Sequence, residues 1–266
     1  MIGSEAPTQF DLRFRLFGFP IRVSPWFWLV MALFGSNLIQ ALGLPYLFLW
    51  IGCGFVSILV HELGHAFAYR LFGARAEIVL HGFGGYARGQ QLRSPWQRML
   101  VSLAGPFAQF ALAAAVHLTA VYVYAWDQQS PILRVAKYFL LLMNIVWAVL
   151  NLVPVLPLDG GNVMREVFQI VGLRNPDAAA HLVSVFVAAL MAARGVLAFI
   201  GRDGLRLPVI DDNPLVSLYT TPGPMFTFWL VMLAIDNYQR YQMFRAYRPD
   251  RYLAEDDDDT PPWRRR

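Results

Sequence analysis

Cysteine, lysine and charged side chains are scarce in this 266-residue chain, and each shortage narrows what the protein can be. The single cysteine, Cys53, excludes an intramolecular disulfide framework and any metal site built from several cysteines. Lys137 is the only lysine, and charged residues make up 15% of the chain. The basic residues are spread between apolar runs instead of forming one patch, which argues against nucleic-acid binding.

Apolar side chains are abundant, at 57% of the residues, and the mean hydropathy is +0.43. A soluble domain of this length needs fewer apolar residues to form its core, so we expect the protein to lie in the lipid bilayer. The sequence predicts an all-α integral membrane protein with about six transmembrane helices, each needing about 20 mostly apolar residues. The apolar runs occupy residues 26–43, 46–72, 99–125, 132–153, 179–200 and 223–237. We expect the first run to be a retained span, because the mixed polar segment before it does not resemble a cleavable signal.

The distribution of arginine predicts the topology. Arginines precede the first run, fill the second and fourth connections and follow the last run; they are Arg13, Arg15, Arg22, Arg70, Arg75, Arg88, Arg93, Arg98, Arg165, Arg174, Arg240, Arg245, Arg248 and Arg251. Because basic residues favour the cytoplasmic side, we expect a protein of the cell membrane with both termini inside. The basic residues at 134, 137, 202 and 206 run against this pattern.

This reading divides the chain into three parts: a cytoplasmic segment at 1–25, a membrane domain at 26–237 and a cytoplasmic tail at 238–266. The tail ends in an acidic run that we expect to be disordered. Residues 201–224 are rich in turn-forming residues and are expected to form an outer loop. Residues 73–92 have apolar and β-branched residues around a glycine cluster, which favours a short hairpin at the cytoplasmic membrane surface; the alternative is a plain flexible loop.

An ionisable cluster stands inside the second apolar run, in "FVSILVHELGHAFAYRLFG". On a helix, residues four apart share a face, so His61 and His65 can offer nitrogens to one metal ion. Glu62 stands beside them, where it can reach a water on that metal. A pair of histidines bonded to neighbouring carbonyls is the alternative, but it leaves a glutamate at membrane depth without a purpose.

Two histidines leave a zinc ion short of a third protein ligand. The candidate is Asp159 in "NLVPVLPLDGGNVMREVFQ", which follows a proline-containing turn and precedes two glycines. Its carboxylate can point back between the helices, or it can cap a helix that starts near Gly161. Spacing alone leaves both readings open.

The motifs "HELGHAFAYRLFG", the glycine-rich "FGG" and "NLVPVLPLDGG" together resemble the site-2 protease family of intramembrane zinc metalloproteases. The resemblance covers about residues 45–170. It implies that His61, His65 and Asp159 bind one zinc ion per chain and that Glu62 is the catalytic base. It further implies hydrolysis of peptide bonds within or beside a substrate's transmembrane helix.

The same resemblance implies a role for Asn144, in "LLMNIVWAVLNLVP", because the family places an asparagine in the span before the aspartate motif. There it is expected to hold substrate or the developing oxyanion, a task that suits an amide donor. An interhelical hydrogen bond is the alternative. His181 is expected to form a hydrogen bond with a neighbouring helix. His81 is expected either to lie at the surface or to pack within the hairpin.

The connection at 154–178 and the tail are too short for the PDZ or CBS domains that many relatives carry, so we expect a minimal member of the family. The expected partners are a transmembrane protein substrate, the lipid bilayer and a regulatory membrane protein, with no nucleic acid. A catalytically silent scaffold that binds membrane helices is the alternative function. A transport role is a further one, but the paired broken helices typical of transporters are missing from the sequence.

A transmembrane helix must unwind before its peptide carbonyls can be attacked. We expect the segment Glu77–Arg88 to offer a free strand edge to which an extended substrate adds. Val79 or Tyr86 is expected to donate its N–H outward from that edge.

Overall fold

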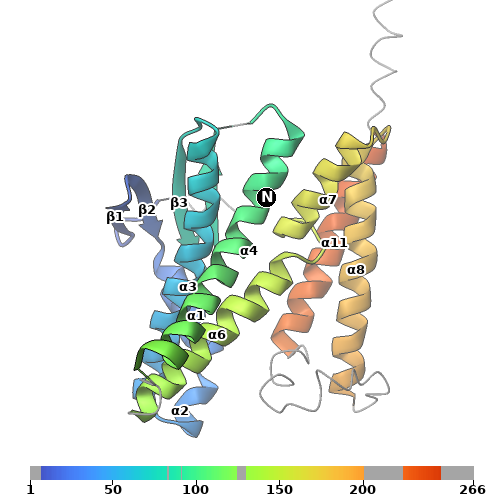
Figure 1. Ribbon diagram of the computed structural model, residues 1–266. Helices are drawn as coiled ribbons and strands as arrows, with labels where there is room; N and C mark the ends of the chain where they lie inside the picture. The colour runs from blue at the N-terminus through green and yellow to red at the C-terminus, as the bar shows by residue number, and fades with distance from the viewer. Residues whose placement is uncertain (1–6, 83, 91, 125–129, 201–223, 247–266) are drawn as a thin grey trace, which may run out of the picture. The chain divides into compact units, whose positions relative to one another are not determined.

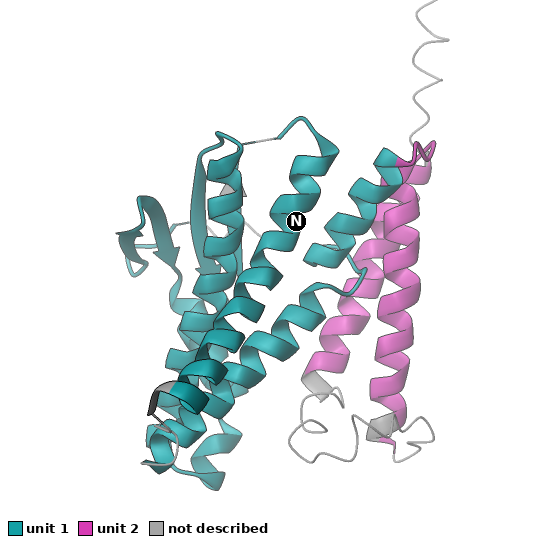
Figure 2. Ribbon diagram, viewed as in Figure 1, with its two compact units in different colours: residues 1–170 teal, residues 171–266 magenta. Residues whose placement is uncertain are grey.

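The computed structural model describes residues 7–82, 84–90, 92–124, 130–200 and 224–246. Contacts divide the chain into two compact units, Met1–Ile170 and Val171–Arg266 (Figure 2). Most of the loop expected at 201–224 and the acidic end of the tail lie outside the described residues.

The first unit begins with a hairpin of two strands, β1 (Leu12–Leu16) and β2 (Phe19–Val23). Phe17 and Gly18 connect them with positive φ angles of 52° and 83°, the backbone that a two-residue type I′ turn requires. Alternate residues of β2 are buried, as expected for a strand with one face on the core. The segment expected at 1–25 thus contains two strands that the sequence did not predict.

Strands β3 (Ala76–His81) and β4 (Gly84–Gly89) form the hairpin expected at 73–92. Strand β3 also pairs in parallel with β2, which gives one sheet in the order β1-β2-β3-β4 (Figure 1). The chain is therefore mostly helical, with a four-stranded sheet instead of an isolated hairpin. β4 is an edge strand, whereas β3 has a neighbour on each side.

The apolar run at 26–43 does not form one continuous helix. It is divided into α1 (Pro25–Phe34) and α2 (Asn37–Ala41). Gly35 lies at the break, where an added Cβ would stand 2.6 Å from Cδ1 of Trp50. Trp50 also donates from Nε1 to the carbonyl of Met31 at 3.1 Å, so the break is fixed by packing on the next helix.

Helix α3 (Leu44–Leu71) is the centre of the first unit, and it packs on α1, α2, α4, α6 and the β3–β4 hairpin (Figure 1). Helix α4 (Pro95–Leu118) approaches it closely, because Gly64 lies so near Ala104 that an added Cβ would stand 2.4 Å from the Ala104 carbonyl oxygen. Small residues are a common device for such contacts between membrane helices.

The rest of the first unit returns the chain to α3. Helix α4 continues into a short π-helix, η1 (Thr119–Tyr124), and α6 (Pro131–Asn151) then runs beside α3 and α4. Helix α7 (Asp159–Ile170) follows after a turn and packs on α4.

The second unit consists of α8 (Pro176–Phe199) and α11 (Pro224–Ala246), which pack on each other. Nδ1 of His181 lies 2.8 Å from Oδ1 of Asn237, both of them buried. The prediction that a neighbouring helix satisfies His181 is confirmed. An added Cβ on Gly195 would stand 2.2 Å from Oγ1 of Thr227, so these helices also meet closely at a small residue.

Four described helices are long and apolar enough to cross a membrane: Leu44–Leu71, Pro95–Tyr122, Pro131–Asn151 and Pro176–Leu197. The chain is thus a membrane protein by its helices, but the described residues support four such spans where six were expected. The first apolar run does not form a helix long enough to cross the membrane, because it is broken at Gly35 and leaves an apolar helix of ten residues. The last run forms α11, whose described residues include the charged side chains of Asp236, Arg240 and Arg245.

Candidate metal centre

Helix α3 carries the three ionisable residues of the HELGH motif in its buried part. His61, Glu62 and His65 are 5%, 3% and 8% exposed. The spacing of four puts the two imidazole rings in contact, with centroids 4.6 Å apart. The structure therefore places both histidines on one face, as the sequence predicts.

Asp159 is brought to the histidines by the turn before α7. Its Oδ2 lies 3.1 Å from Nε2 of His61 and 3.5 Å from Nε2 of His65. The two glycines that follow it allow the close approach, because a Cβ on Gly160 would stand 2.1 Å from the Leu152 carbonyl oxygen. Asp159 is itself the first residue of α7, so the reading in which it caps the helix from the preceding position does not apply.

The hydrogen bonds of the two imidazoles fix which nitrogens face the cluster. Nδ1 of His65 lies 2.7 Å from the carbonyl oxygen of Val101, which can only accept, so this nitrogen carries the hydrogen. Nδ1 of His61 lies 3.0 Å from Oε1 of Gln109, whose Nε2 donates to the Ser57 carbonyl at 3.4 Å. Both neutral imidazoles then present a bare Nε2 to the cluster.

Three electron-pair donors consequently converge without a hydrogen between them. The two Nε2 atoms are 3.0 Å apart, and the three ligand atoms of His61, His65 and Asp159 all lie within 4.8 Å of one another. Asp159 Oδ2 is buried and accepts no hydrogen bond in the described part of the chain. Such an arrangement is repulsive by itself and fits a bound cation; two imidazoles and a carboxylate are a donor set typical of zinc.

Glu62 lies beside the three ligands but belongs to a different environment, next to the edge strand β4. The backbone N–H of Ala87 contacts its carboxylate. A Cβ on Gly85 would stand 2.7 Å from both Cγ and Oε1 of Glu62, so only glycine leaves room for this side chain. Oε2 of Glu62 is buried and has no hydrogen-bond partner among the described residues. The carboxylate is thus available to a proton.

Helix α4 supplies three groups that sequence reasoning missed. Val101 and Gln109 orient the two imidazoles, as described above. Gly105 faces the two histidines, and an added Cβ would stand 2.4 Å from Nε2 of His65. In the sequence, these residues stand out only as a glutamine inside an apolar run and a Gly-Pro pair. Neither feature indicates a contact with α3 until the packing of the two helices is known.

Asn144 lies on α6, fully buried, and reaches the same region through Ser57. Its Nδ2 donates to Oγ of Ser57 at 2.9 Å and to the Leu140 carbonyl at 2.8 Å. Its Oδ1 has no hydrogen-bond partner in the described residues. The bond to Ser57 joins α6 to α3. Ser57 therefore links Asn144 to Gln109 and, through it, to His61.

His81 and His181 do not belong to this group of ligand atoms. His81 stands at the end of β3 with its ring centroid 5.6 Å from that of Tyr86, which agrees with packing within the hairpin. His181 lies in the second unit with Asn237.

Comparisons with known proteins agree with this geometry. The model of peptidase family M50 matches residues 50–136 and 124–193, which together cover more than half of the chain. Zinc metalloprotease MJ0392 of Methanocaldococcus jannaschii is 27% identical over 157 residues, which are 58% of this chain and 44% of the relative. A Synechocystis sp. protein, sll0528, provisionally named a zinc metalloprotease, is 33% identical over 174 residues, 60% of this chain and 45% of the relative. The chain thus spans less than half the length of these curated relatives.

Among solved structures, the site-2 protease from Methanocaldococcus jannaschii shares the fold, with a TM-score of 0.53 and 22% identity over 85% of this chain and 95% of that one. The residues matched by the family model include the whole cluster of His61, Glu62, His65 and Asp159. The chain therefore belongs to peptidase family M50.

Proposed function

We propose that this chain is a zinc-dependent endopeptidase that hydrolyses peptide bonds within or beside the transmembrane segments of other membrane proteins. One observation carries the proposal: three electron-pair donors, from His61, His65 and Asp159, converge inside a membrane-spanning helix bundle with a carboxylate beside them. The family membership and the names of the zinc metalloprotease relatives support the same conclusion.

Zinc, when bound, supplies Lewis-acid chemistry that polarises a carbonyl and makes water more acidic. His61, His65 and Asp159 are the residues that hold it. Glu62 accepts the proton of the attacking water and passes it to the leaving amine. The Ala87 N–H keeps the Glu62 carboxylate beside β4, which leaves its Oε2 for this proton transfer.

The substrate is proposed to add to β4 as an extended strand. Strand β3 is paired on both sides, so Val79 has no outward N–H to offer, and that part of the sequence-based expectation is wrong. The Gln90 N–H donates to the Arg75 carbonyl, and the Ala87 N–H contacts Glu62. In an antiparallel ladder successive N–H groups point alternately toward and away from the partner strand. The N–H groups of the even-numbered residues of β4 therefore point toward β3, and this includes Tyr86, which was expected to point outward.

The outward N–H groups of β4 are therefore those of residues 85, 87 and 89; the Ala87 N–H already contacts Glu62, so Gly85 and Gly89 are the ones left for a substrate strand. A substrate strand beside them would lie next to Glu62, which is where the proton transfer must occur. Side-chain-independent pairing suits an enzyme that selects helices by how easily they unwind.

Asn144 is proposed to donate to the substrate or the developing oxyanion. Both hydrogens of its amide are used in the structure, by Ser57 and Leu140. The proposed role therefore requires it to exchange one of these bonds for a substrate oxygen.

The proposal is tested by measuring bound zinc and cleavage of a model transmembrane peptide with purified protein. Glu62→Gln should keep zinc, because Glu62 is not a ligand, and should lose at least about 100-fold in cleavage rate. Asp159→Asn is the matched control, which should lose both zinc and cleavage. Normal cleavage by Glu62→Gln would refute the mechanism, whereas zinc binding without cleavage by the unaltered protein would favour a silent scaffold.

A further inference from the structure

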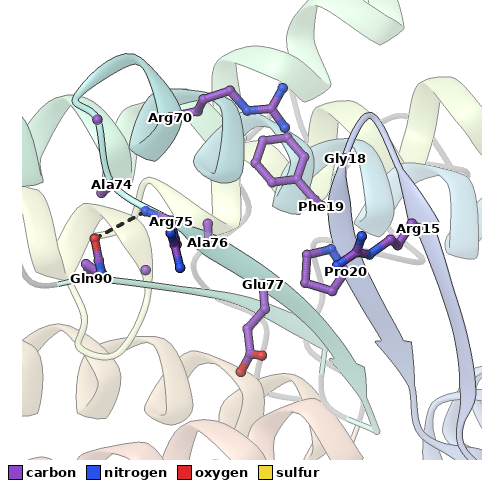
Figure 3. Close-up of a pocket in the computed structure, with 12 residues that line it drawn as sticks. Arg15, Gly18, Phe19, Pro20, Arg70, Ala74, Arg75, Ala76, Glu77 and Gln90 are labelled. Carbon is purple, nitrogen blue, oxygen red and sulfur yellow. Dashed lines mark hydrogen bonds between the residues drawn. The ribbon is translucent and has the colours of Figure 1, made fainter.

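A cavity of about 820 Å³ lies at one end of the sheet, away from the metal cluster (Figure 3). It is bordered by the turn between β1 and β2, by the end of α3 and by the start of β3. Three of its lining residues are arginines from three different elements: Arg15 on β1, Arg70 on α3 and Arg75 before β3. None of the metal ligands lines it.

No carboxylate of the described residues forms an ion pair with the guanidinium groups around the cavity. Within the described ranges, the side chains of Arg15 and Arg75 make no hydrogen bond or ion pair. Arg70 lies 3.7 Å above the centroid of the Phe19 ring (Figure 3). It also donates to the Phe17 carbonyl at 2.6 Å, so both of its partners are neutral. Glu77 is the acidic lining residue, and it forms no ion pair with these arginines. The cavity keeps an excess of positive charge that attracts an anion.

An apolar rim of Phe17, Phe67 and Leu71 lies beside the cavity, next to the lining residues Gly18, Phe19 and Arg70. Phe67 on α3 packs on the rings of Phe17 and Phe19, at 5.7 Å and 5.2 Å between centroids. Nevertheless Phe17 is 62% exposed, and Leu71, next to Arg70 in the chain, is 84% exposed. Large apolar side chains this open are expected to face lipid, since α3 is one of the membrane-spanning helices.

The position of the cavity relative to the bilayer follows from the length of α3. Its 28 residues extend over about 42 Å, whereas the hydrocarbon core is about 30 Å thick. At least one end of α3 therefore reaches the head-group region, and the C-terminal end is the one expected there because it carries the charged Arg70. Positive groups beside exposed apolar ones at that depth match a ligand with an anionic head and apolar tails.

We propose that this cavity binds the phosphate head group of an anionic membrane lipid, with the acyl chains along Phe17, Phe67 and Leu71. The arginines alone would also suit a free phosphate ion. The exposed apolar rim distinguishes the two, because only a lipid covers it. The proposal does not depend on the protease activity.

The test uses the full chain in a neutral detergent, with bound lipid counted by native mass spectrometry during titration with phosphatidylglycerol or phosphatidylcholine. The variant Arg15→Gln/Arg75→Gln removes the two arginines whose side chains make no hydrogen bond or ion pair with the described residues, so the fold should survive. It should weaken phosphatidylglycerol binding about 30-fold, because each of the two arginines is expected to contribute about fivefold beside an anionic head group. Phosphatidylcholine binding should not change.

Arg93→Gln is the control, because Arg93 is an exposed arginine on the connection before α4 and does not line the cavity. It should bind phosphatidylglycerol as the unaltered protein does. An equal loss in this control, or no preference for phosphatidylglycerol over phosphatidylcholine, would overturn the proposal. Displacement of the lipid by an equal concentration of inorganic phosphate would also overturn it, by showing that the cavity recognises the free ion.

Discussion

Gln109 determines which nitrogen of His61 faces the ligand atoms of His65 and Asp159, although it is uncharged and touches no proposed substrate group. It is completely buried, accepts from Nδ1 of His61 and donates to the Ser57 carbonyl. An apolar residue at this position would leave the His61 hydrogen without its acceptor and would free the ring to rotate. The side chain would therefore act on a bound metal ion through His61.

We expect Gln109→Leu to weaken zinc binding by about 10- to 100-fold, the range measured for partners of metal-ligating histidines. Competition with a chelator measures this. Gln109→Glu is the matched variant, since it keeps an acceptor for the His61 hydrogen and should retain most of the affinity. Asn144→Ala, on the other side of Ser57, should retain zinc and lose cleavage instead. Equal zinc affinity in Gln109→Leu and the unaltered protein would contradict the assigned role.

At the scale of residues, the sequence predicts what depends on local spacing. His61 and His65 share a face because a helix turns every 3.6 residues, and the structure confirms it. Spacing alone could not decide whether Asp159 is a metal ligand or a helix cap. Its position depends on how the turn before α7 brings it back to α3, and α3 is far away in the sequence. Gln109 could not be found at all, since it meets His61 only after α3 and α4 pack at Gly64 and Gly105.

At the scale of elements, a buried ion pair joins α4 to α7. Arg98 donates to Oε2 of Glu166 from Nε at 2.9 Å and from Nη2 at 2.6 Å, and Arg165 donates to Oε1 at 2.8 Å. Glu166 is 1% exposed. Burial opposes its ionisation, but the hydrogen bonds from Arg98 and Arg165 outweigh burial and lower its pKa below the ordinary 4.5. The pair holds the helix that begins with Asp159.

We expect Glu166→Gln to lower the free energy of unfolding by about 1.5–3 kcal/mol near neutral pH, because the hydrogen bonds to a charged acceptor are weakened. A lowered pKa in the folded state means that this stabilisation is complete above the ordinary pKa and is lost as the pH falls through the folded value. The difference between variant and unaltered protein should thus shrink below about pH 4.5. Thermal unfolding in detergent at several pH values measures it.

The control for this measurement is Asp236→Asn. Asp236 and Arg240 form a half-buried pair one turn apart on α11, and the loss of such a pair near the surface should cost less than about 1 kcal/mol at any pH. A Glu166→Gln difference that stays constant from neutral to acidic pH would show that the ionised carboxylate is not what stabilises the α4–α7 contact.

Strand addition to β4 makes a prediction about alternate residues of the substrate. An extended strand points successive N–H groups to opposite sides, so only every second one can pair with β4. A peptide methylated at the nitrogens that face β4 near the cleavage site should be cleaved about fivefold more slowly for each hydrogen bond lost. A peptide methylated at the intervening nitrogens, which face away from β4, should be cleaved at the unaltered rate. If both peptides are cleaved at the same rate, the substrate does not pair with β4.

The elements predicted from the sequence are those that their own pattern specifies. The glycine cluster indicated the β3–β4 hairpin, and long apolar stretches indicated α3, α4, α6 and α8. β1 and β2 were missed because a mixed polar segment acquires a buried face only when β2 pairs with β3. The break at Gly35 was missed because it results from contact with Trp50.

At the scale of the whole molecule, the sheet restricts the topology. Strand β2 pairs with β3, which follows the C-terminal end of α3, so α1 and α2 must return the chain to the opposite end of α3. We propose that the sheet and the tail are cytoplasmic, and we predict that reporters at Gly43 and Asp127 lie on the outer side. Reporter fusions at these positions and in the tail measure this, and the same side for Gly43 and the tail would contradict it.

The parallel pairing of β2 with β3 also has a consequence for synthesis. The N-terminal hairpin leaves the ribosome first, but its partner strand follows only after the whole of α3 has been made. The sheet therefore cannot close until the helix with His61 and His65 has entered the bilayer in the correct orientation. A nascent chain in which that helix is inserted backwards would carry β2 and β3 on opposite sides of the membrane, so its exposed strand edges would distinguish it from a correctly inserted chain for quality-control proteases.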